Sequence, residues 1–264
     1  MAIIQHGSFG DTPVTFKKDA IAKMANAASL RLLDKVSLVQ QASRSIQSQT
    51  LVIPESSNER GLALKSITLK KDFEGFIEKL FKDVNNHLGN DIYFVAWVWD
   101  LSGEPPVLFP SPDSSGNFDP QKCIFSVNVS EERAFGGVGI NLLGPRKIVG
   151  GINVRMQIWE SDRKTSDFGK AMTVVADTVK NSQFSLDLIS LAVGFATGGV
   201  TTAPINLIAK ASANLASAVG GILQAQSDDY VDFFEGYYPI NYPCKPGQEM
   251  TEEGYDCKLV FTML

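Results

Sequence analysis

The stretch Ile92-Tyr93-Phe94-Val95-Ala96-Trp97-Val98-Trp99 decides the fold class of this chain. It consists almost entirely of aromatic and β-branched residues, and the turn signal Asp100-Leu101-Ser102-Gly103 follows it, so the pattern predicts a β-strand. The run contains no charged side chain. It is therefore expected to be a central strand that is buried on at least one face.

Strand patterns continue on both sides of this stretch. They cover Leu62–Leu69, Cys123–Val129, Gly137–Leu143, Lys147–Trp159, Tyr230–Glu235 and Asp256–Met263, and Gly103–Pro120 is expected to be a surface loop. The alternation breaks near Lys65-Ser66, which indicates a β-bulge. Between residues 152 and 158, Ile, Val and Met side chains alternate with Asn, Arg and Gln, which places the two sets on opposite faces of one strand. Strands at short spacing, without a helix after each, favour an antiparallel sheet or sandwich over a doubly wound parallel sheet.

Helical periodicity occurs near the N-terminus and again after residue 160. Two N-terminal helices are expected, over Asp19–Ile46 and from Phe73 to Leu88, the second beginning after Asp72. A helical hairpin is expected at about 165–226, with its arms joined by Thr197–Ala203. The predicted fold class is α+β. The chain, 1–264, is expected to be a single domain with an antiparallel β-sandwich-like sheet, two N-terminal helices and the inserted α-helical hairpin.

The hairpin contains an unusually charge-poor segment. From Leu188 to Leu223 there is one charged residue, Lys210, in a chain in which 20% of residues are charged. Three interpretations remain open: a hairpin packed into the core, a hairpin that inserts conditionally into a membrane, and a dimerisation surface. Neither arm is expected to be a permanent span, because a spanning helix needs about 20 mainly apolar residues and a lysine near the bilayer centre is costly.

Small residues and tyrosines supply the candidate contact residues. In the second arm, small side chains recur every fourth position, an arrangement that lets two helices approach closely. Tyr237, Tyr238 and Tyr242 could contact carbohydrate, lipid headgroups or protein, although core and rim packing is the simpler interpretation. The candidate membrane or partner contacts are Gly194, Gly198, Lys210, Ala213, Ser217, Gly221, Tyr237 and Tyr238.

The sequence offers little material for catalysis. Its two histidines, His6 and His87, lie outside any metal or triad motif, and no GxSxG string occurs. The glycines of Gly136–Leu142 do not open a helix as a dinucleotide fingerprint would, and they favour a bend or bulge in a strand. We predict no catalytic residue, no cofactor and no metal.

Loop carboxylates leave one alternative to this prediction. If neighbouring strand ends bring them together, a calcium site could form, but solvated loop acids are the simpler interpretation. The acids concerned are Asp100, Glu104, Asp113, Asp119, Glu160 and Asp162.

Charge and targeting signals limit the partners. Lys and Arg number 24 against 29 Asp and Glu, a net charge of −5, which argues against nucleic acid as a partner. The first residues lack the basic and apolar regions of a signal peptide, so a cytoplasmic location or release by a route other than Sec is expected. Cys123, Cys244 and Cys257 are interpreted as ordinary thiols, with a Cys244–Cys257 disulfide as the alternative.

These observations favour a soluble, non-enzymatic binding protein. We expect a toxin-like or membrane-perturbing protein whose charge-poor hairpin is a mobile element, with membrane lipid or a surface receptor as partner and oligomers forming on activation. The alternative is a protein–protein interaction or assembly module that uses the hairpin as core or dimer contact. An enzyme that uses carboxylates alone is a third hypothesis.

Overall fold

The computed structural model describes residues 3–7, 53–73, 90–161, 165–196, 202–225 and 228–264. The first predicted helix, Asp19–Ile46, lies outside these residues. So does residue range 74–89, which holds nearly all of the second predicted helix. The description below concerns the two sheets and the inserted helices.

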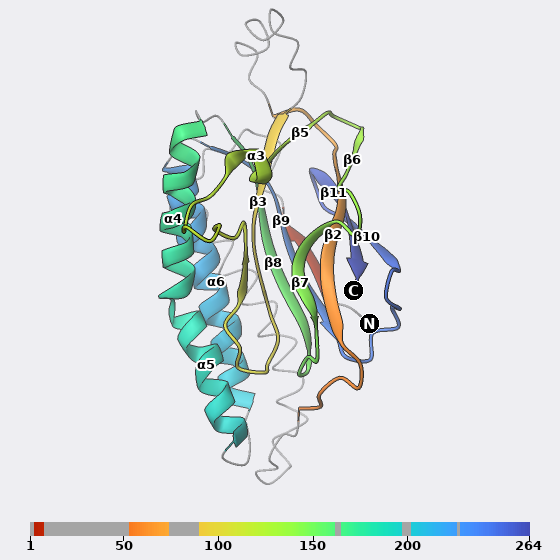
Figure 1. The fold of residues 1–264 in the computed structure, drawn as a ribbon, viewed down its shortest axis with the longest axis vertical. Coiled ribbons are helices and arrows are strands. Elements are labelled where there is room, and N and C mark those ends of the chain that lie inside the picture. Colours follow the sequence, from red (N-terminus) through yellow and green to blue (C-terminus); the bar gives the residue numbers. More distant parts are fainter. Residues whose placement is uncertain (1–2, 8–52, 74–89, 162–164, 197–201, 226–227) are drawn as a thin grey trace, which may run out of the picture.

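Two antiparallel sheets pack face to face, as the sequence predicted (Figure 1). Sheet A has the order β1 (Ile3–Gly7), β9 (Asp229–Pro239), β8 (Gly151–Glu160), β3 (Asn90–Trp99) and β4 (Val107–Phe109), and β5 (Ile124–Val127) also pairs with β3. Sheet B has the order β10 (Glu249–Glu253), β11 (Cys257–Met263), β2 (Arg60–Leu69) and β6 (Glu132–Ala134), and β7 (Ile140–Arg146) also pairs with β2.

The inner faces of the two sheets enclose one hydrophobic core, which we call the sandwich core. The rings of Phe234 on β9 and Phe261 on β11 meet across it at a centroid distance of 4.8 Å. Phe94 of β3 contributes at the other side, where it stacks on Phe125 at 5.6 Å. Because aromatic pairs bury large areas and add to stability beyond that burial, the Phe234–Phe261 contact stabilises the packing of the two sheets, and the Phe94–Phe125 contact stabilises the pairing of β3 with β5 within sheet A.

Strand β3 is central, as predicted, and is buried on both faces. Ile92, Phe94, Ala96 and Val98 face the sandwich core, whereas Tyr93, Val95, Trp97 and Trp99 face the opposite side of sheet A. All eight side chains are at most 5% exposed. Apolar residues are favoured on both faces of such a strand, which explains why the run from Ile92 to Trp99 does not alternate.

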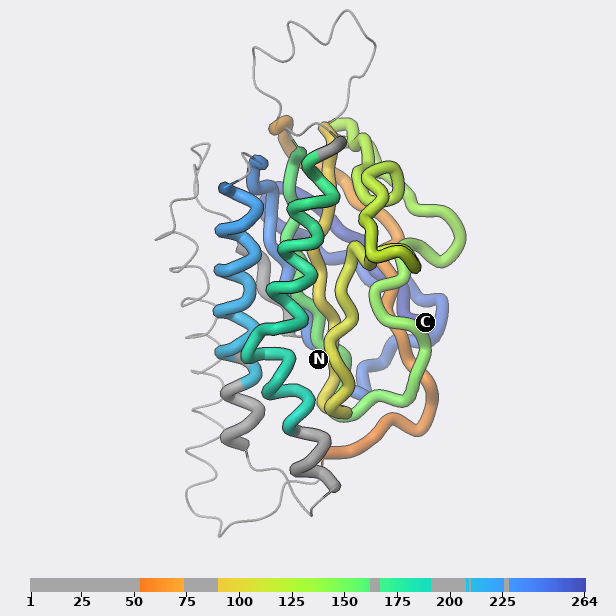
Figure 2. Tube along the Cα trace, turned by 60° about the vertical axis from the view of Figure 1, so that its left-hand side comes forward, coloured from red at the N-terminus to blue at the C-terminus, as the bar shows by residue number. Residues whose placement is uncertain are grey.

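Three helices form a layer on the outer face of sheet A (Figures 1 and 2). They are α4 (Thr165–Lys180), α5 (Gln183–Ala196) and α6 (Thr202–Gln224), and together we call them the helical layer. A short helix, α3 (Pro120–Cys123), precedes β5 and is capped by Asp119. The order of layers is therefore helices, sheet A and sheet B, which makes the described fold α+β.

The first arm of the predicted hairpin is two helices instead of one. The apolar period from Phe168 to Val193 is interrupted at Asn181 and Ser182, where Ser182 Oγ accepts from the backbone N–H of Ser185 at 3.2 Å and so caps α5. The side chains of Ser182 and Ser185 also both donate to the carbonyl of Val179 near the end of α4. Local side-chain hydrogen bonds of this kind compete with a continuous helix.

Several finer predictions can be compared with the structure. The β-bulge is confirmed: the pairing of β2 with β11 shifts between Ser66 and Leu64, which leaves Lys65 as the extra residue. The loop from Gly103 to Pro120 contains the short strand β4, which the prediction missed. The three cysteines are free and buried, so the alternative of a Cys244–Cys257 disulfide is wrong.

Candidate functional site: the helical layer on sheet A

The helical layer is an insertion between two strands that are neighbours in sheet A. Strands β8 and β9 pair from Gly151 with Pro239 to Glu160 with Asp229, and the inserted chain leaves after Glu160 and returns before Asp229. Both connections therefore lie at the same end of the β8–β9 pair. Displacement of the helices would break no pairing between strands of sheet A.

The interface between the helical layer and sheet A is mainly apolar. Tyr93 and Phe168 meet edge to face at a ring distance of 5.3 Å, and Trp99 meets Phe184 in the same way at 4.9 Å. The helices contribute buried side chains of similar character: Phe168, Met172, Val175, Phe184, Leu188, Ile208, Leu215, Val219 and Leu223. Burial of about nine such side chains is the main source of stability at this interface.

Hydrogen bonds to Ser212 and Ala216 place α6 on the sheet, and a further one lies beside its end. Trp97 Nε1 donates to Ser212 Oγ at 3.1 Å, and Gln157 Nε2 donates to the carbonyl oxygen of Ala216 at 2.7 Å. Beyond the end of α6, the hydroxyl of Tyr93 donates to the carboxylate of Asp228. Ser212 and Ala216 are one helical turn apart, so the sheet holds two successive turns of α6.

An ion pair between a buried arginine and a glutamate that is 14% exposed lies in the same face of sheet A. Arg155 on β8 is 1% exposed, and its Nη2 lies 2.5 Å from Oε1 of Glu235 on β9. The guanidinium also lies 5.7 Å from the ring centroid of Phe233. Arg155 pairs with Trp97 of β3 on one side and with Glu235 of β9 on the other, so these three residues form one row across the sheet.

The predicted contact residues of α6 have different environments. Lys210 is exposed, Ala213 is 1% exposed, and Ser217 and Gly221 are half-buried. A Cβ atom built on Gly221 would meet nothing within 4 Å, so that glycine marks no close approach. The adjoining row, Ser212, Ala216 and Gly220, is the one that is buried throughout and bonds to sheet A.

The two remaining predicted glycines come from the first arm of the hairpin and the connection that follows it. Gly194 lies in α5, near its end. Gly198 lies outside the described residues.

The tyrosines near the end of β9 form contacts within the protein. Tyr237 is half-buried, and its hydroxyl donates to the carbonyl of Gly150 at 2.9 Å. Tyr238 is 1% exposed within the sandwich core and meets the ring of Tyr242 edge to face at 5.5 Å. In this conformation Tyr238 presents no surface to a partner.

Apolar side chains are also exposed on the outside of the helical layer. Leu186 and Ile189 on α5 are 52% and 46% exposed, and Val174 on α4 is 50% exposed. Leu186 and Ile189 are three residues apart and so share one face of their helix. Among the described residues, no helix combines the length and the mean hydropathy that crossing a bilayer requires.

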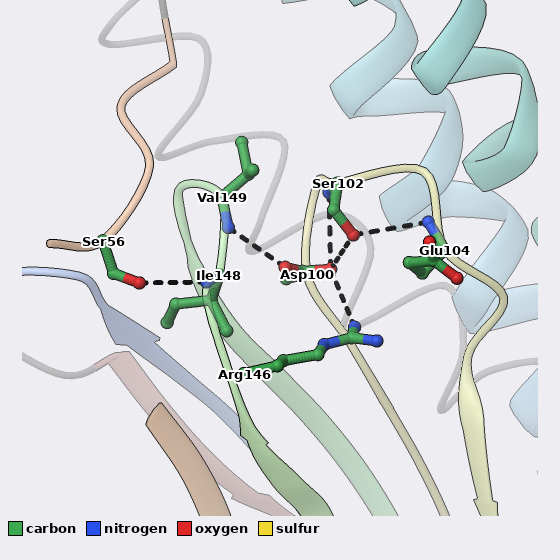
Figure 3. Close-up of polar contacts among 7 residues, drawn as sticks. All are labelled: Ser56, Asp100, Ser102, Glu104, Arg146, Ile148 and Val149. Carbon is green, nitrogen blue, oxygen red and sulfur yellow. Dashed lines mark hydrogen bonds and ion pairs between the residues drawn. The ribbon is translucent and has the colours of Figure 1, made fainter. Parts of the chain in front are cut away.

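The candidate calcium-binding acids do not gather at one place. Asp100 is fully buried and accepts hydrogen bonds from the Arg146 side chain at 2.9 Å, the Val149 backbone N–H at 3.0 Å and the Ser102 hydroxyl at 2.6 Å (Figure 3). These bonds fasten the turn after β3 to the turn before β8. The carboxylate of Asp100 therefore has a structural role.

Of the other acids, Asp162 lies outside the described residues, and the backbone N–H of Glu104 donates to the Ser102 hydroxyl in the turn after β3. Asp113 accepts two backbone hydrogen bonds within its own loop, and Asp119 caps α3. Since Trp99 pairs with Asn153 and Ile92 with Glu160, Asp100 and Glu160 lie at opposite ends of the β3–β8 pair, about 27 Å apart. The condition that neighbouring strand ends bring these acids together is not met. No group of three potential metal-ligating side chains occurs in the described part of the chain.

A second buried polar cluster lies at the far side of the sandwich core. Asp232 on β9 accepts hydrogen bonds from the backbone N–H groups of Asp256 and Cys257, at 3.0 and 3.2 Å. Burial raises the pKa of the Asp232 carboxyl, although these hydrogen bonds oppose the shift. Burial likewise raises the pKa of Glu252 on β10 to about 7. Both carboxyls contribute to the pH dependence of stability and lie away from the helical layer.

Sequence reasoning missed the polar residues under the helices. Arg155 and Gln157 were placed correctly on one face of their strand, but their burial was not predicted. The neighbouring strand carried the signal for this burial. Trp97 and Trp99 lie on the same face of the sheet, and large aromatic side chains on a face indicate that another part of the chain packs against it. Comparison of the chain with family models, with curated proteins and with solved structures finds no match in any of the three.

Proposed function

We propose that this chain is a non-enzymatic, membrane-perturbing protein of the toxin-like kind, in which the helical layer leaves sheet A and places its apolar residues on a lipid surface. The observation that carries the proposal is the position of the helices as an insertion at one end of the β8–β9 pair. Release of the layer would keep both sheets paired and would free the apolar side chains now buried against sheet A.

The composition of the layer supports a lipid surface as the target. The segment from Leu188 to Leu223 carries a single charge, on the exposed side chain of Lys210. Leu186 and Ile189 already lie at the surface of the closed form and offer a first contact. Helices with one apolar face bind at the boundary between headgroups and acyl chains without crossing the bilayer.

Vesicle leakage tests the proposal. The whole chain is added to dye-loaded vesicles of phosphatidylcholine, with and without phosphatidylserine, at pH 7.4 and at pH 5. Leakage is expected in at least one condition, and intact vesicles in all of them would refute the proposal.

A pair of surface variants shows which residues make the first contact. Leu186→Ser with Ile189→Ser removes two half-exposed apolar side chains, each worth about 1 kcal/mol on further burial, so binding is expected to weaken roughly 30-fold. Val138→Ser is the matched control, because Val138 is 57% exposed between β6 and β7, away from the helices. Equal binding by both variants would contradict the assigned contact.

The exposed pair on α5 also favours a second candidate, a protein-assembly module. Leu186 and Ile189 would then contact a second protein chain instead of lipid. Light scattering over a range of concentrations distinguishes the two. A wild-type oligomer that the Leu186→Ser, Ile189→Ser variant dissociates supports assembly, whereas a monomer at high concentration speaks against self-association.

A further inference from the structure

The ion pair of Arg155 and Glu235 lies beside the residues of sheet A that bond to α6. Trp97, beside Arg155 in the sheet, bonds to Ser212, and Gln157, the next residue on the same face of β8, bonds to Ala216. Arg155 therefore lies next to both points at which the sheet holds the helix. At 1% exposure it is as buried as the apolar side chains around it.

The pair is incompletely satisfied in the closed form. Among the described residues, Nε and Nη1 of Arg155 and Oε2 of Glu235 have no hydrogen-bond partner, and all three atoms are buried. An arginine side chain carries five N–H donors, and one salt bridge uses only part of them. A buried donor without a partner, and a buried ion pair in general, costs more in lost hydration than a well-packed apolar pair of similar size.

The same atoms would become hydrated if the helical layer moved away. The closed form therefore bears an energetic cost that the open form does not, while the apolar contacts of the layer act in the opposite direction. The difference between these two contributions sets how often the layer opens.

We propose that the Arg155–Glu235 pair destabilises the contact between α6 and sheet A. The pair thereby raises the population of the state in which the helical layer has left the sheet. The proposal rests on the proposed release of the layer and assigns the residues that regulate it. An apolar replacement of both partners is then expected to hold the layer closed, and removal of only one partner is expected to open it.

Hydrogen exchange on the whole chain tests this assignment. In Arg155→Met with Glu235→Leu, exchange of the α6 amides is expected to slow about tenfold, because replacing a buried ion pair with apolar residues is commonly stabilising. In Arg155→Met alone, exchange in α6 is expected to accelerate, because a buried carboxylate loses its cation. The amides of β2 and β11 in sheet B report global unfolding and are expected to change less.

A control pair removes an ion pair of the same charge type outside the interface. Lys70 and Glu253 lie 2.7 Å apart on sheet B and are 39% and 60% exposed, and Lys70→Met with Glu253→Leu is expected to leave exchange in α6 unchanged. If the Arg155–Glu235 pair instead stabilised the closed layer, every variant that removes it would exchange faster in α6. The opposite signs of the single and double replacements separate the two explanations.

Exchange in α6 that is unchanged or faster in the double variant would overturn the inference. If that variant does not fold, Glu235→Gln provides the test. Its hydrogen exchange is expected to accelerate in α6 but not in β2 or β11. Equal acceleration in all three elements, or no acceleration, would overturn the inference. Leakage measured on the same variants keeps the two proposals apart. Intact vesicles together with the expected exchange pattern would refute the membrane function alone.

Discussion

Replacement of Asp100 by alanine is expected to destabilise the fold strongly. The carboxylate is fully buried and accepts hydrogen bonds from Arg146, from the backbone N–H of Val149 and from the Ser102 hydroxyl (Figure 3). The alanine variant leaves these three donors without their acceptor. Arg146 is 29% exposed and can partly rehydrate, which places each stranded donor near the lower end of the usual 1–3 kcal/mol. The sum is about 3 kcal/mol.

Thermal and urea unfolding at pH 7 measure this loss. For a chain of this length, about 3 kcal/mol corresponds to a fall in Tm of roughly 6–12 °C. Asp113→Ala is the matched control, because Asp113 also accepts two backbone hydrogen bonds but is exposed. Its Tm is expected to match that of the wild type. A Tm of Asp100→Ala within about 1 °C of the wild type, or an equal fall in both variants, would refute the structural role of Asp100.

Three further predictions concern pH, backbone approach and the helical layer. Because burial raises the pKa of Glu252 to about 7, its protonated form stabilises the fold, and that stability is lost as the pH rises from about 4.5 through 7. Glu252→Gln should therefore raise the Tm relative to the wild type increasingly over this range, and a constant difference between pH 4 and 8 would contradict it. A Cβ atom at Gly254 would lie 2.3 Å from Oδ2 of Asp232, so Gly254→Ala should lower the free energy of unfolding, measured in urea, by about 1–3 kcal/mol. Gly136 has open space around it, so Gly136→Ala should change this free energy little, and equal losses in the two variants would refute the close approach. Phe184→Ala should lower the free energy of unfolding by about 3–5 kcal/mol and should accelerate hydrogen exchange in α4, α5 and α6 more than in sheet B. Equal acceleration in the helices and in sheet B would show that the layer does not open separately.

The strands with strong side-chain patterns were predictable from the sequence. The run from Ile92 to Trp99 indicated a central strand because an uninterrupted series of apolar and aromatic residues is typical of a strand buried on both faces. The phase change at Lys65 indicated the bulge because an extra residue moves every later side chain to the other face. These predictions depend on local chemistry alone, and the structure confirms them.

Features that depend on distant partners were not predictable. The break at Asn181 and Ser182 was hidden because apolar residues at helical spacing occur on both sides of it, and only the cap that the Ser182 hydroxyl makes with the backbone N–H of Ser185 marks the start of α5. Arg155 and Glu235 are 80 residues apart and meet through the register of β8 with β9.

Tryptophan quenching tests the central claim most directly, because all three tryptophans of the chain, Trp97, Trp99 and Trp159, lie buried between sheet A and the helical layer. Vesicles that the protein binds or permeabilises are expected to expose these side chains: acrylamide quenching rises and the emission shifts to longer wavelength, while the circular dichroism of the sheets is retained. Vesicle binding or leakage with the tryptophans still shielded from acrylamide would contradict it, since the membrane would then be engaged without movement of the helices.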